Sequence, residues 1–184
     1  MKSMLQIKPF INKDTIIRKT GELVEKFIQK NSKEHELIFV TVLTGAKTFA
    51  NEFLEIFKTN CRKNFKNCFI KLSSYGAGTS SSGEIKVLQD IEEDLKGKAV
   101  CIIEDIVDTG LTMDFLINYL KTKKQAKSVQ IITLLDKPSR RKTNVSIDFI
   151  GFEVPDKFVV GFGIDFNQQY RELDYIGVLE EGKE

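Results

Sequence analysis

The sequence predicts an α/β fold in which a mainly parallel central sheet is flanked by helices. Apolar runs of strand length alternate along the chain with segments of helical periodicity, which is the pattern of βαβ units. Residues 100–103, VCII, are apolar throughout, as in a strand buried on both faces. With 184 residues, 41% of them hydrophobic, the chain can bury a sizeable core, and it has no repeat or interdomain linker. We therefore expect a single domain over residues 1–184.

Three segments have the apolar spacing of helices. Residues 14–30 repeat apolar side chains at helical intervals, and Asp14 is available as a cap at the start. Residues 46–58 place four apolar side chains on the inner side, and residues 111–121 form a similar stripe. The apolar positions are Ile16, Ile17, Leu23, Val24, Phe27 and Ile28 in the first helix, Phe49, Phe53, Leu54 and Phe57 in the second, and Leu111, Phe115, Leu116, Tyr119 and Leu120 in the third.

The expected strands are short apolar runs between these helices. Each is bounded by turn residues or by a helical segment, which is what connected βαβ units require. In order along the chain they are residues 37–43, 69–74, 84–88, 100–104, 129–135 and 147–152.

Charge and cysteine usage exclude several classes of protein. Lys and Arg number 28 against 26 Asp and Glu, so the net charge of +2 provides no broad basic field for nucleic acid. The basic run KTKKQAK at residues 121–127 is best explained as a solvated helix end. Cys61, Cys68 and Cys101 lack any C-x-x-C spacing, which argues against a disulfide framework or a zinc site and favours the cytoplasm. The lone His35 is expected to be a loop residue.

We expect no association with a membrane. No apolar segment approaches the roughly 20 residues that a spanning helix needs. The N-terminus, MKSMLQIKPF, lacks the apolar centre of a signal peptide.

The most informative stretch is residues 100–112, VCIIEDIVDTGLT, which predicts a strand, an acidic loop and a helix start. Ligands of open α/β sheets bind beyond the carboxyl ends of strands, and a helix N-terminus offers free N–H groups to an anion. A phosphate would fit at residues 108–112. The vicinal Glu104 and Asp105 could accept hydrogen bonds from two ribose hydroxyls or hold Mg²⁺, and Asp108 could act as a proton acceptor. The alternative is a structural loop in which Asp108 or Thr109 caps the helix.

A second loop, YGAGTSSSG at residues 75–83, only superficially begins like a dinucleotide-binding motif. Ser81 stands where that motif needs a third glycine or alanine, and the following EIKVL has strand character where a helix should begin. No P-loop pattern is present either. A Gly/Ser-rich loop of this length is typical of a mobile flap that excludes water during catalysis, although a surface loop without function is the alternative.

The string at residues 100–112 resembles the phosphoribosyl-diphosphate binding signature of the type I phosphoribosyltransferases. That signature is a hydrophobic strand, two acids, two apolar residues, and then Asp, Thr, Gly, any residue and Thr. Three later segments resemble the hypoxanthine/guanine branch of the family, in the same order and at similar spacing. They are LLDKPSRR at 134–141, IGFEVPDKFVVGFGIDF at 150–166 and YRELDYIG at 170–177.

The resemblance spans essentially the whole chain and implies the type I phosphoribosyltransferase fold. That fold has a core, here about residues 36–150, and a small hood built from the N- and C-terminal segments. The hood would comprise about residues 1–13 and 153–184. Relatives form dimers or tetramers, so the resemblance also implies a homo-dimer or homo-tetramer.

The resemblance gives each candidate site residue a role. Asp108 is the catalytic base that takes the proton from purine N7, and Glu104 and Asp105 contact the ribose. The 5′-phosphate is bound by Asp108, Thr109, Gly110, Leu111 and Thr112. Pyrophosphate is bound by Leu43, Thr44, Gly45 and Arg171, with an unusual cis peptide after the leucine. Ser74 and Tyr75, at the start of the 75–83 loop, pack over the donor.

The purine site and the cofactor follow from the same resemblance. Lys137 donates to the oxygen at purine C6, Phe158 stacks on the base, and Val159 offers backbone groups to its edge. Asp165 holds Mg²⁺ through water, so the metal residues are Glu104, Asp105 and Asp165. An ammonium selects an oxo group over an amino group, which disfavours adenine. Taken alone, Asp165 could instead cap a helix over residues 166–173, with Arg171 on its surface.

The implied reaction is Mg²⁺-dependent transfer of a 5-phosphoribosyl group from phosphoribosyl diphosphate to N9 of hypoxanthine or guanine. Two other functions stay open. One is a regulatory protein that keeps the fold and binds RNA or DNA, and the other is a transferase that prefers xanthine. Some relatives have lysine where this chain has Thr44 and Leu111, but both positions act chiefly through backbone groups, so we expect activity to survive.

Overall fold

The computed structural model, which describes residues 5–34, 36–74 and 85–181, contains a six-stranded sheet and a three-stranded sheet. The larger sheet has the order β4-β3-β2-β5-β6-β7, and all neighbours in it are parallel except β3 and β4. The smaller sheet is antiparallel with the order β1-β9-β8. The expected α/β fold with a mainly parallel sheet is therefore confirmed.

The strands are β1 (Leu5–Ile11), β2 (Glu36–Leu43), β3 (Asn64–Ser74), β4 (Ile85–Gln89), β5 (Ala99–Val107), β6 (Ser128–Asp136), β7 (Phe149–Glu153), β8 (Val159–Val160) and β9 (Ile176–Glu181). The helices are α1 (Lys13–Lys30), α2 (Lys47–Asn60) and α3 (Leu111–Thr122), with a short 3₁₀ helix, η1, at Pro138–Arg140.

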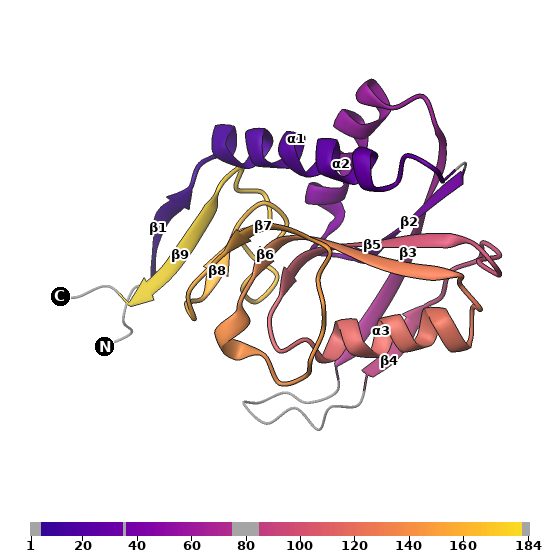
Figure 1. Ribbon diagram of the computed structural model, residues 1–184. Helices are drawn as coiled ribbons and strands as arrows, with labels where there is room; N and C mark the ends of the chain where they lie inside the picture. Colours follow the sequence, from indigo (N-terminus) through magenta and orange to yellow (C-terminus); the bar gives the residue numbers. More distant parts are fainter. Residues whose placement is uncertain (1–4, 35, 75–84, 182–184) are drawn as a thin grey trace.

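The three helices form layers on the two faces of the six-stranded sheet. Figure 1 shows α1 and α2 on one face and α3 on the other. Successive residues of β2 alternate between the faces, because a strand has a side-chain period of two. The side chain of Phe39 belongs to a phenylalanine-rich core between the sheet and helices α1 and α2. Ile38 and Val40 belong to a second core between the sheet and α3. Each face of the central strands is thus covered, as their continuous apolar character predicts.

The parallel arrangement brings functional segments together. Strands β2, β5 and β6 run in the same direction, so their carboxyl ends at Leu43, Val107 and Asp136 meet at one edge of the sheet. The loops that follow these three strands therefore adjoin one another. Strand β5 ends three residues later than expected, because Ile106 and Val107 still pair with β6.

The start of α1 differs from the expected one. Its N-cap is Asn12, whose side-chain oxygen accepts a hydrogen bond from the Thr15 N–H at 2.9 Å. The expectation that Asp14 caps this helix is wrong; Asp14 lies in the first turn, where its charge complements the helix dipole.

The second sheet takes its strands from both ends of the chain, where the family's hood is expected. Sequence patterns did not indicate β1, since Pro9 and Lys8 interrupt it and proline is confined to edge strands or irregular positions. The register of β1 with β9 indeed shifts between Pro9 and Ile11. The division into a core of about 36–150 and a hood stays a prediction. Among the residues described, no helix is long and apolar enough to cross a membrane.

Candidate active site

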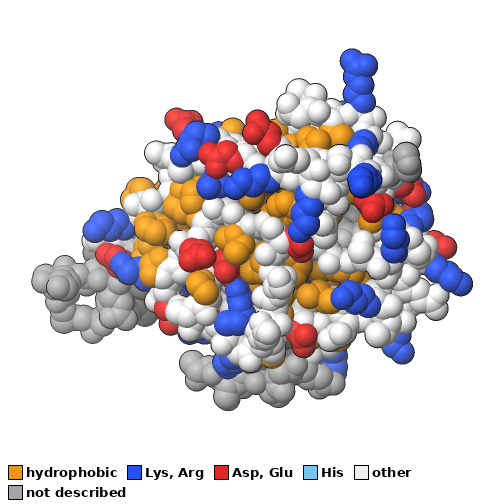
Figure 2. All heavy atoms as spheres, viewed as in Figure 1, with side chains coloured by type: hydrophobic (Ala, Val, Ile, Leu, Met, Phe, Trp, Pro, Cys, Tyr) orange, Lys and Arg blue, Asp and Glu red, His pale blue; other side chains and the backbone are white. Residues whose placement is uncertain are grey.

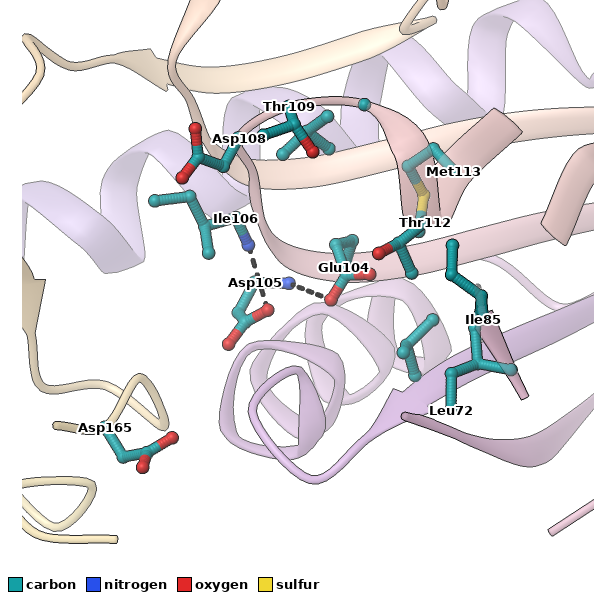
Figure 3. Close-up of a pocket in the computed structure, with 13 residues that line it drawn as sticks. Leu72, Ile85, Glu104, Asp105, Ile106, Asp108, Thr109, Thr112, Met113 and Asp165 are labelled. Carbon is teal, nitrogen blue, oxygen red and sulfur yellow. Dashed lines mark hydrogen bonds between the residues drawn. The ribbon is translucent and has the colours of Figure 1, made fainter. Parts of the chain in front are cut away.

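A cavity of about 440 Å³ lies at the sheet edge where β2 and β5 end. Its wall combines the acids of β5, the loop 108–110, the first turn of α3 and Asp165 from the C-terminal segment. Figure 3 shows these side chains gathered around one space although Asp165 is far from the others in sequence. The strand, loop and helix start predicted at residues 100–112 thus form one side of this cavity.

Glu104 and Asp105 are adjacent carboxyl groups without a cation partner in the described part of the chain. Glu104 is only 6% exposed, and its Oε1 accepts a hydrogen bond from the Asp105 N–H at 3.2 Å. Asp105 Oδ1 accepts from the Ile106 N–H at 3.0 Å. Burial and the neighbouring charge of Asp105 raise the pKa of the Glu104 carboxyl well above its usual range. An external cation or hydroxyl donors would relieve this repulsion.

The helix start at α3 is built to leave backbone donors free. Its N-cap is Gly110, whose φ of +83° is a left-handed conformation that favours glycine, and no side chain caps the helix. Thr109 Oγ1 reaches only the Leu111 N–H, at a long 3.4 Å. The alternative in which Asp108 or Thr109 serves as the N-cap is therefore wrong. An uncapped helix N-terminus facing a cavity suits an anion.

The carboxylate of Asp108 points away from Glu104 (Figure 3), and it contacts the loop that follows β6. Its Oδ1 accepts a hydrogen bond from Nε of Arg140 at 2.9 Å. Arg140 also lies 3.6 Å from the carboxylate of Asp156, so it bridges the two acids. The side chains of Asp108 and Arg140 are 39% and 45% exposed. Asp108 is therefore accessible to a bound molecule.

The Leu43–Thr44 peptide bond is cis, which confirms that expectation from the resemblance. The following Gly45 packs directly against the acid pair: a Cβ added to it would lie 1.9 Å from Asp105 Oδ2. Gly163 is also close, since a Cβ added to it would lie 2.2 Å from the carbonyl oxygen of Gly45. This turn thus approaches both Asp105 of β5 and the C-terminal segment closely.

Arg171 and Asp165 bind each other. Arg171 Nη2 lies 2.6 Å from Asp165 Oδ1, and its Nη1 donates to the Gly163 carbonyl at 2.7 Å. Asp165 Oδ2 accepts from the Gln168 N–H at 2.7 Å. Residues 166–173 form turns, so the alternative of a helix capped by Asp165, with Arg171 on its surface, is wrong. The residues expected to bind Mg²⁺ and pyrophosphate are thereby brought beside the Gly45 turn.

Lys137 and Phe158 are not part of the cavity wall, although the Lys137 N–H donates to the carbonyl of Val107, which is part of it. Lys137 is buried, and its Nζ donates to the Lys157 carbonyl at 2.6 Å. Burial lowers the pKa of this ammonium. Phe158 is 71% exposed, which is unusual for phenylalanine, while Val159 at the start of β8 is buried. The expected purine residues are therefore neighbours, with one apolar ring open to solvent.

The donor set fits Mg²⁺ in chemistry, because hard cations prefer carboxylate oxygens. Glu104, Asp105 and Asp165 line the same cavity. Within residues 5–34, 36–74 and 85–181, however, no three acidic, His or Cys side chains cluster closely enough to form a metal site by themselves. Ser74 is the last residue of β3, while the whole expected 75–83 flap, including Tyr75, lies outside the described residues.

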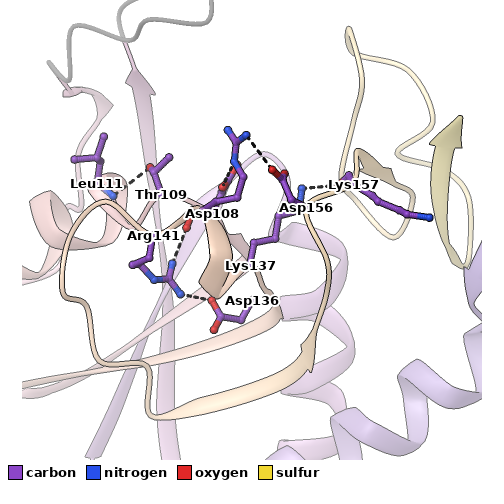
Figure 4. Close-up of polar contacts among 9 residues, drawn as sticks. Asp108, Thr109, Leu111, Asp136, Lys137, Arg141, Asp156 and Lys157 are labelled. Atoms are coloured by element: carbon purple, nitrogen blue, oxygen red, sulfur yellow. Dashed lines mark hydrogen bonds and ion pairs between the residues drawn. The ribbon is translucent and has the colours of Figure 1, made fainter. Parts of the chain in front are cut away.

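Sequence reasoning missed the arginines that follow Lys137. Arg140 contacts the Asp108 carboxylate, and Arg141 contacts the Asp108 carbonyl and the carboxylate of Asp136 (Figure 4). The available signal was the pair of adjacent arginines in a loop next to a predicted site lysine. No sequence pattern indicates that these arginines contact Asp108, about 30 positions earlier. The contact arises because β5 and β6 are neighbours in the sheet.

The phosphoribosyl transferase domain family matches residues 11–167 of this chain. The chain belongs to this family. It is 42% identical over 173 residues to the hypoxanthine-guanine phosphoribosyltransferase of Bacillus subtilis, a match that covers 94% of this chain and 93% of the relative.

Solved structures of family members share the fold. A hypoxanthine-guanine phosphoribosyltransferase from Bacillus anthracis superposes with a TM-score of 0.86 at 32% identity, covering 96% of this chain and 99% of the other. A hypoxanthine phosphoribosyltransferase from Trypanosoma cruzi gives a TM-score of 0.86 at 30% identity, covering 94% and 91%. The expected type I phosphoribosyltransferase fold is therefore confirmed.

Proposed function

We propose that this phosphoribosyltransferase acts in purine salvage. It transfers the 5-phosphoribosyl group of phosphoribosyl diphosphate to N9 of hypoxanthine or guanine and releases pyrophosphate. The main support is the cavity that Glu104 and Asp105, which have no cation partner among the described residues, share with an uncapped helix N-terminus. The hypoxanthine-guanine phosphoribosyltransferases named above resemble the chain over nearly its full length.

The donor occupies the 440 Å³ cavity. The carboxyl groups of Glu104 and Asp105 accept hydrogen bonds from the ribose hydroxyls and stabilise the positive charge that develops as the anomeric bond breaks. The backbone of residues 108–112 binds the 5′-phosphate at the start of α3. Glu104, Asp105 and Asp165 would hold Mg²⁺, which neutralises charge on the pyrophosphate when bound.

The leaving group is bound by the turn Leu43–Gly45 and by Arg171. Arg171 is already oriented by the Gly163 carbonyl and by Asp165. A guanidinium presents several donors in a fixed plane, so it can keep one of these partners while donating to phosphate oxygens.

The purine lies between Asp108 and the hood. Asp108 takes the proton from N7 as N9 attacks the anomeric carbon. The exposed ring of Phe158 stacks on the base, and backbone groups at Val159 bind its edge. The Lys137 ammonium donates to the C6 oxygen in place of the Lys157 carbonyl that it now contacts. This donor should make adenine, which has an amino group at C6, a poor substrate.

We expect Lys137→Met to raise the KM for hypoxanthine by about 10- to 100-fold, because a hydrogen bond from a charged donor contributes about 1.5–3 kcal/mol. Lys157→Met is the matched control, since Lys157 contributes its carbonyl to Lys137 and its side chain contacts only exposed Glu180 in the described structure. Steady-state kinetics with varied hypoxanthine measure both. Equal KM values for the two variants would remove Lys137 from base recognition.

A panel of bases tests the proposal. Purified protein is assayed with phosphoribosyl diphosphate, Mg²⁺ and hypoxanthine, guanine, xanthine or adenine. We expect turnover with hypoxanthine or guanine, little with adenine, and at least a 10²-fold loss with excess chelator because Mg²⁺ contributes to charge stabilisation. Turnover chiefly with xanthine would support the xanthine-preferring alternative.

The other candidate, a regulatory protein that binds nucleic acid, has less support. Figure 2 shows acidic side chains interspersed with the basic ones on the face in view, and the net charge is +2. A nucleic-acid site would need clustered basic residues. Binding of RNA or DNA without turnover of any purine would favour this alternative.

We also propose a homo-dimer or homo-tetramer in the cytoplasm. Support for an oligomer comes from the family resemblance. The structure of the Trypanosoma cruzi relative was solved to study how its C-terminal region affects the oligomeric state. Support for the cytoplasm comes from the cysteines, all three of which are free thiols. Light scattering of the purified protein tests the oligomeric state.

A further inference from the structure

Arg141 connects the end of β6 with the loop that follows β5. Its Nη1 donates a hydrogen bond to the main-chain carbonyl of Asp108 at 2.8 Å, and its Nη2 forms an ion pair with Asp136 (Figure 4). Asp136 is only 4% exposed and ends β6. A buried ion pair fixes the orientation of both side chains, and the planar guanidinium is therefore held in one direction.

The stem of Arg141 also supports the next glycine of the loop. A Cβ added to Gly110 would lie 2.9 Å from Arg141 Cδ and 2.8 Å from Thr143 Oγ1. Arg141 thus touches the loop at Asp108 and at Gly110, the two residues that bracket Thr109. All three of these loop residues line the cavity.

The contacts turn carbonyl oxygens away from the anion site. The Asp108 carbonyl is bound by Arg141, and the Thr109 carbonyl accepts from the Lys142 N–H at 2.8 Å. In a trans peptide the N–H points opposite to the C=O. The N–H groups of Thr109 and Gly110 therefore point away from the loop after β6. Backbone N–H groups in such a turn bind anions, whereas a carbonyl in the same place would repel them.

We propose that Arg141 is a positioning residue for phosphoribosyl transfer: it orients the Asp108–Gly110 loop so that its N–H groups bind the 5′-phosphate of the donor. This inference rests on the proposed function of the loop and adds a residue that does not itself touch substrate. The energetic effect is expected to be large, because misplacing a bound group by about 1 Å can cost 10²-fold in rate.

The test compares Arg141→Gln with Lys142→Ala in the full-length protein. Arg141→Gln should raise the KM for phosphoribosyl diphosphate by about 10- to 100-fold while the KM for hypoxanthine changes less than threefold. Lys142→Ala removes a neighbouring positive charge but keeps the backbone N–H that binds Thr109, so both constants should stay within twofold of wild type.

A second variant separates positioning from folding. Arg141→Gln leaves the buried Asp136 carboxylate unpaired, which can destabilise the fold. Asp136→Asn/Arg141→Gln removes both charges and should keep the raised donor KM while the melting temperature recovers. If the double variant regains the wild-type donor KM, or if Arg141→Gln lowers only the amount of active protein and leaves both KM values unchanged, Arg141 is merely structural and the inference is wrong.

The same experiment distinguishes this inference from the proposed function. If the wild-type protein turns over hypoxanthine and Arg141→Gln, correctly folded, keeps both KM values, the inference alone fails. If the folded wild-type protein turns over no purine, the proposed function fails and the inference fails with it.

Discussion

Asp108→Asn should lower turnover by about 10²–10⁴-fold, because a positioned general base typically contributes that much and an amide cannot accept the N7 proton. Asp108 lines the cavity and its carboxylate is accessible. Its ion pair with Arg140 is exposed, and exposed pairs contribute only about 0–1 kcal/mol, so the variant should fold normally. The measurement is kcat for hypoxanthine together with the melting temperature.

Asp156→Asn is the matched control for this prediction. Asp156 is the other carboxylate that Arg140 bridges, and it is more exposed than Asp108. Removing the Asp156 charge should change kcat less than threefold, because its ion pair with Arg140 is exposed to solvent. If folded Asp108→Asn retained the wild-type kcat, Asp108 would have no role as the base.

Gly45→Ala should abolish at least 99% of activity while leaving the fold intact. The new Cβ would lie 1.9 Å from Asp105 Oδ2, and the atom in its way is the end of a flexible side chain. The carboxylate must therefore rotate away from its position in the cavity, and displacement of a catalytic group by about 1 Å can cost 10²-fold. We expect kcat/KM for phosphoribosyl diphosphate to fall accordingly.

Gly21→Ala provides the control within the same chain. Gly21 lies in α1, where an added Cβ meets nothing within 4 Å. Alanine there should raise stability by up to about 1 kcal/mol and leave kcat/KM unchanged. Gly45→Ala with unchanged kcat/KM would mean that the position of the Asp105 carboxylate does not matter for catalysis.

Local sequence patterns identify the core elements because those elements are buried in a regular way. The helix at α2 follows from phenylalanines at helical spacing, and Phe49, Phe53 and Phe57 are indeed fully buried. The small sheet is different, since β8 has only two residues and β1 is interrupted by Pro9. Both strands are stabilised by pairing with β9, and for β1 this pairing is a contact between the two ends of the chain that no local pattern encodes.

In the candidate site, too, some residues could be located from local sequence patterns and others could not. The acid pair of β5 and the phosphate loop could be located from sequence because strand, turn and helix start are contiguous. The turns after Asp165 could not, because their shape depends on left-handed residues that are not glycine. Asn167, Gln168 and Tyr170 all have positive φ, which prevents the helix that the composition of this segment would allow. The arginine contacts to Asp108 likewise depend on the neighbouring positions of β5 and β6.

The most direct test of the central claim is product analysis after incubation of the wild-type protein with hypoxanthine, phosphoribosyl diphosphate and Mg²⁺. If the acid cavity binds a phosphoribosyl donor, each hypoxanthine consumed should give one molecule of IMP and one of pyrophosphate, and excess chelator should lower the rate at least 10²-fold. Folded protein that forms neither IMP from hypoxanthine nor GMP from guanine would contradict this claim.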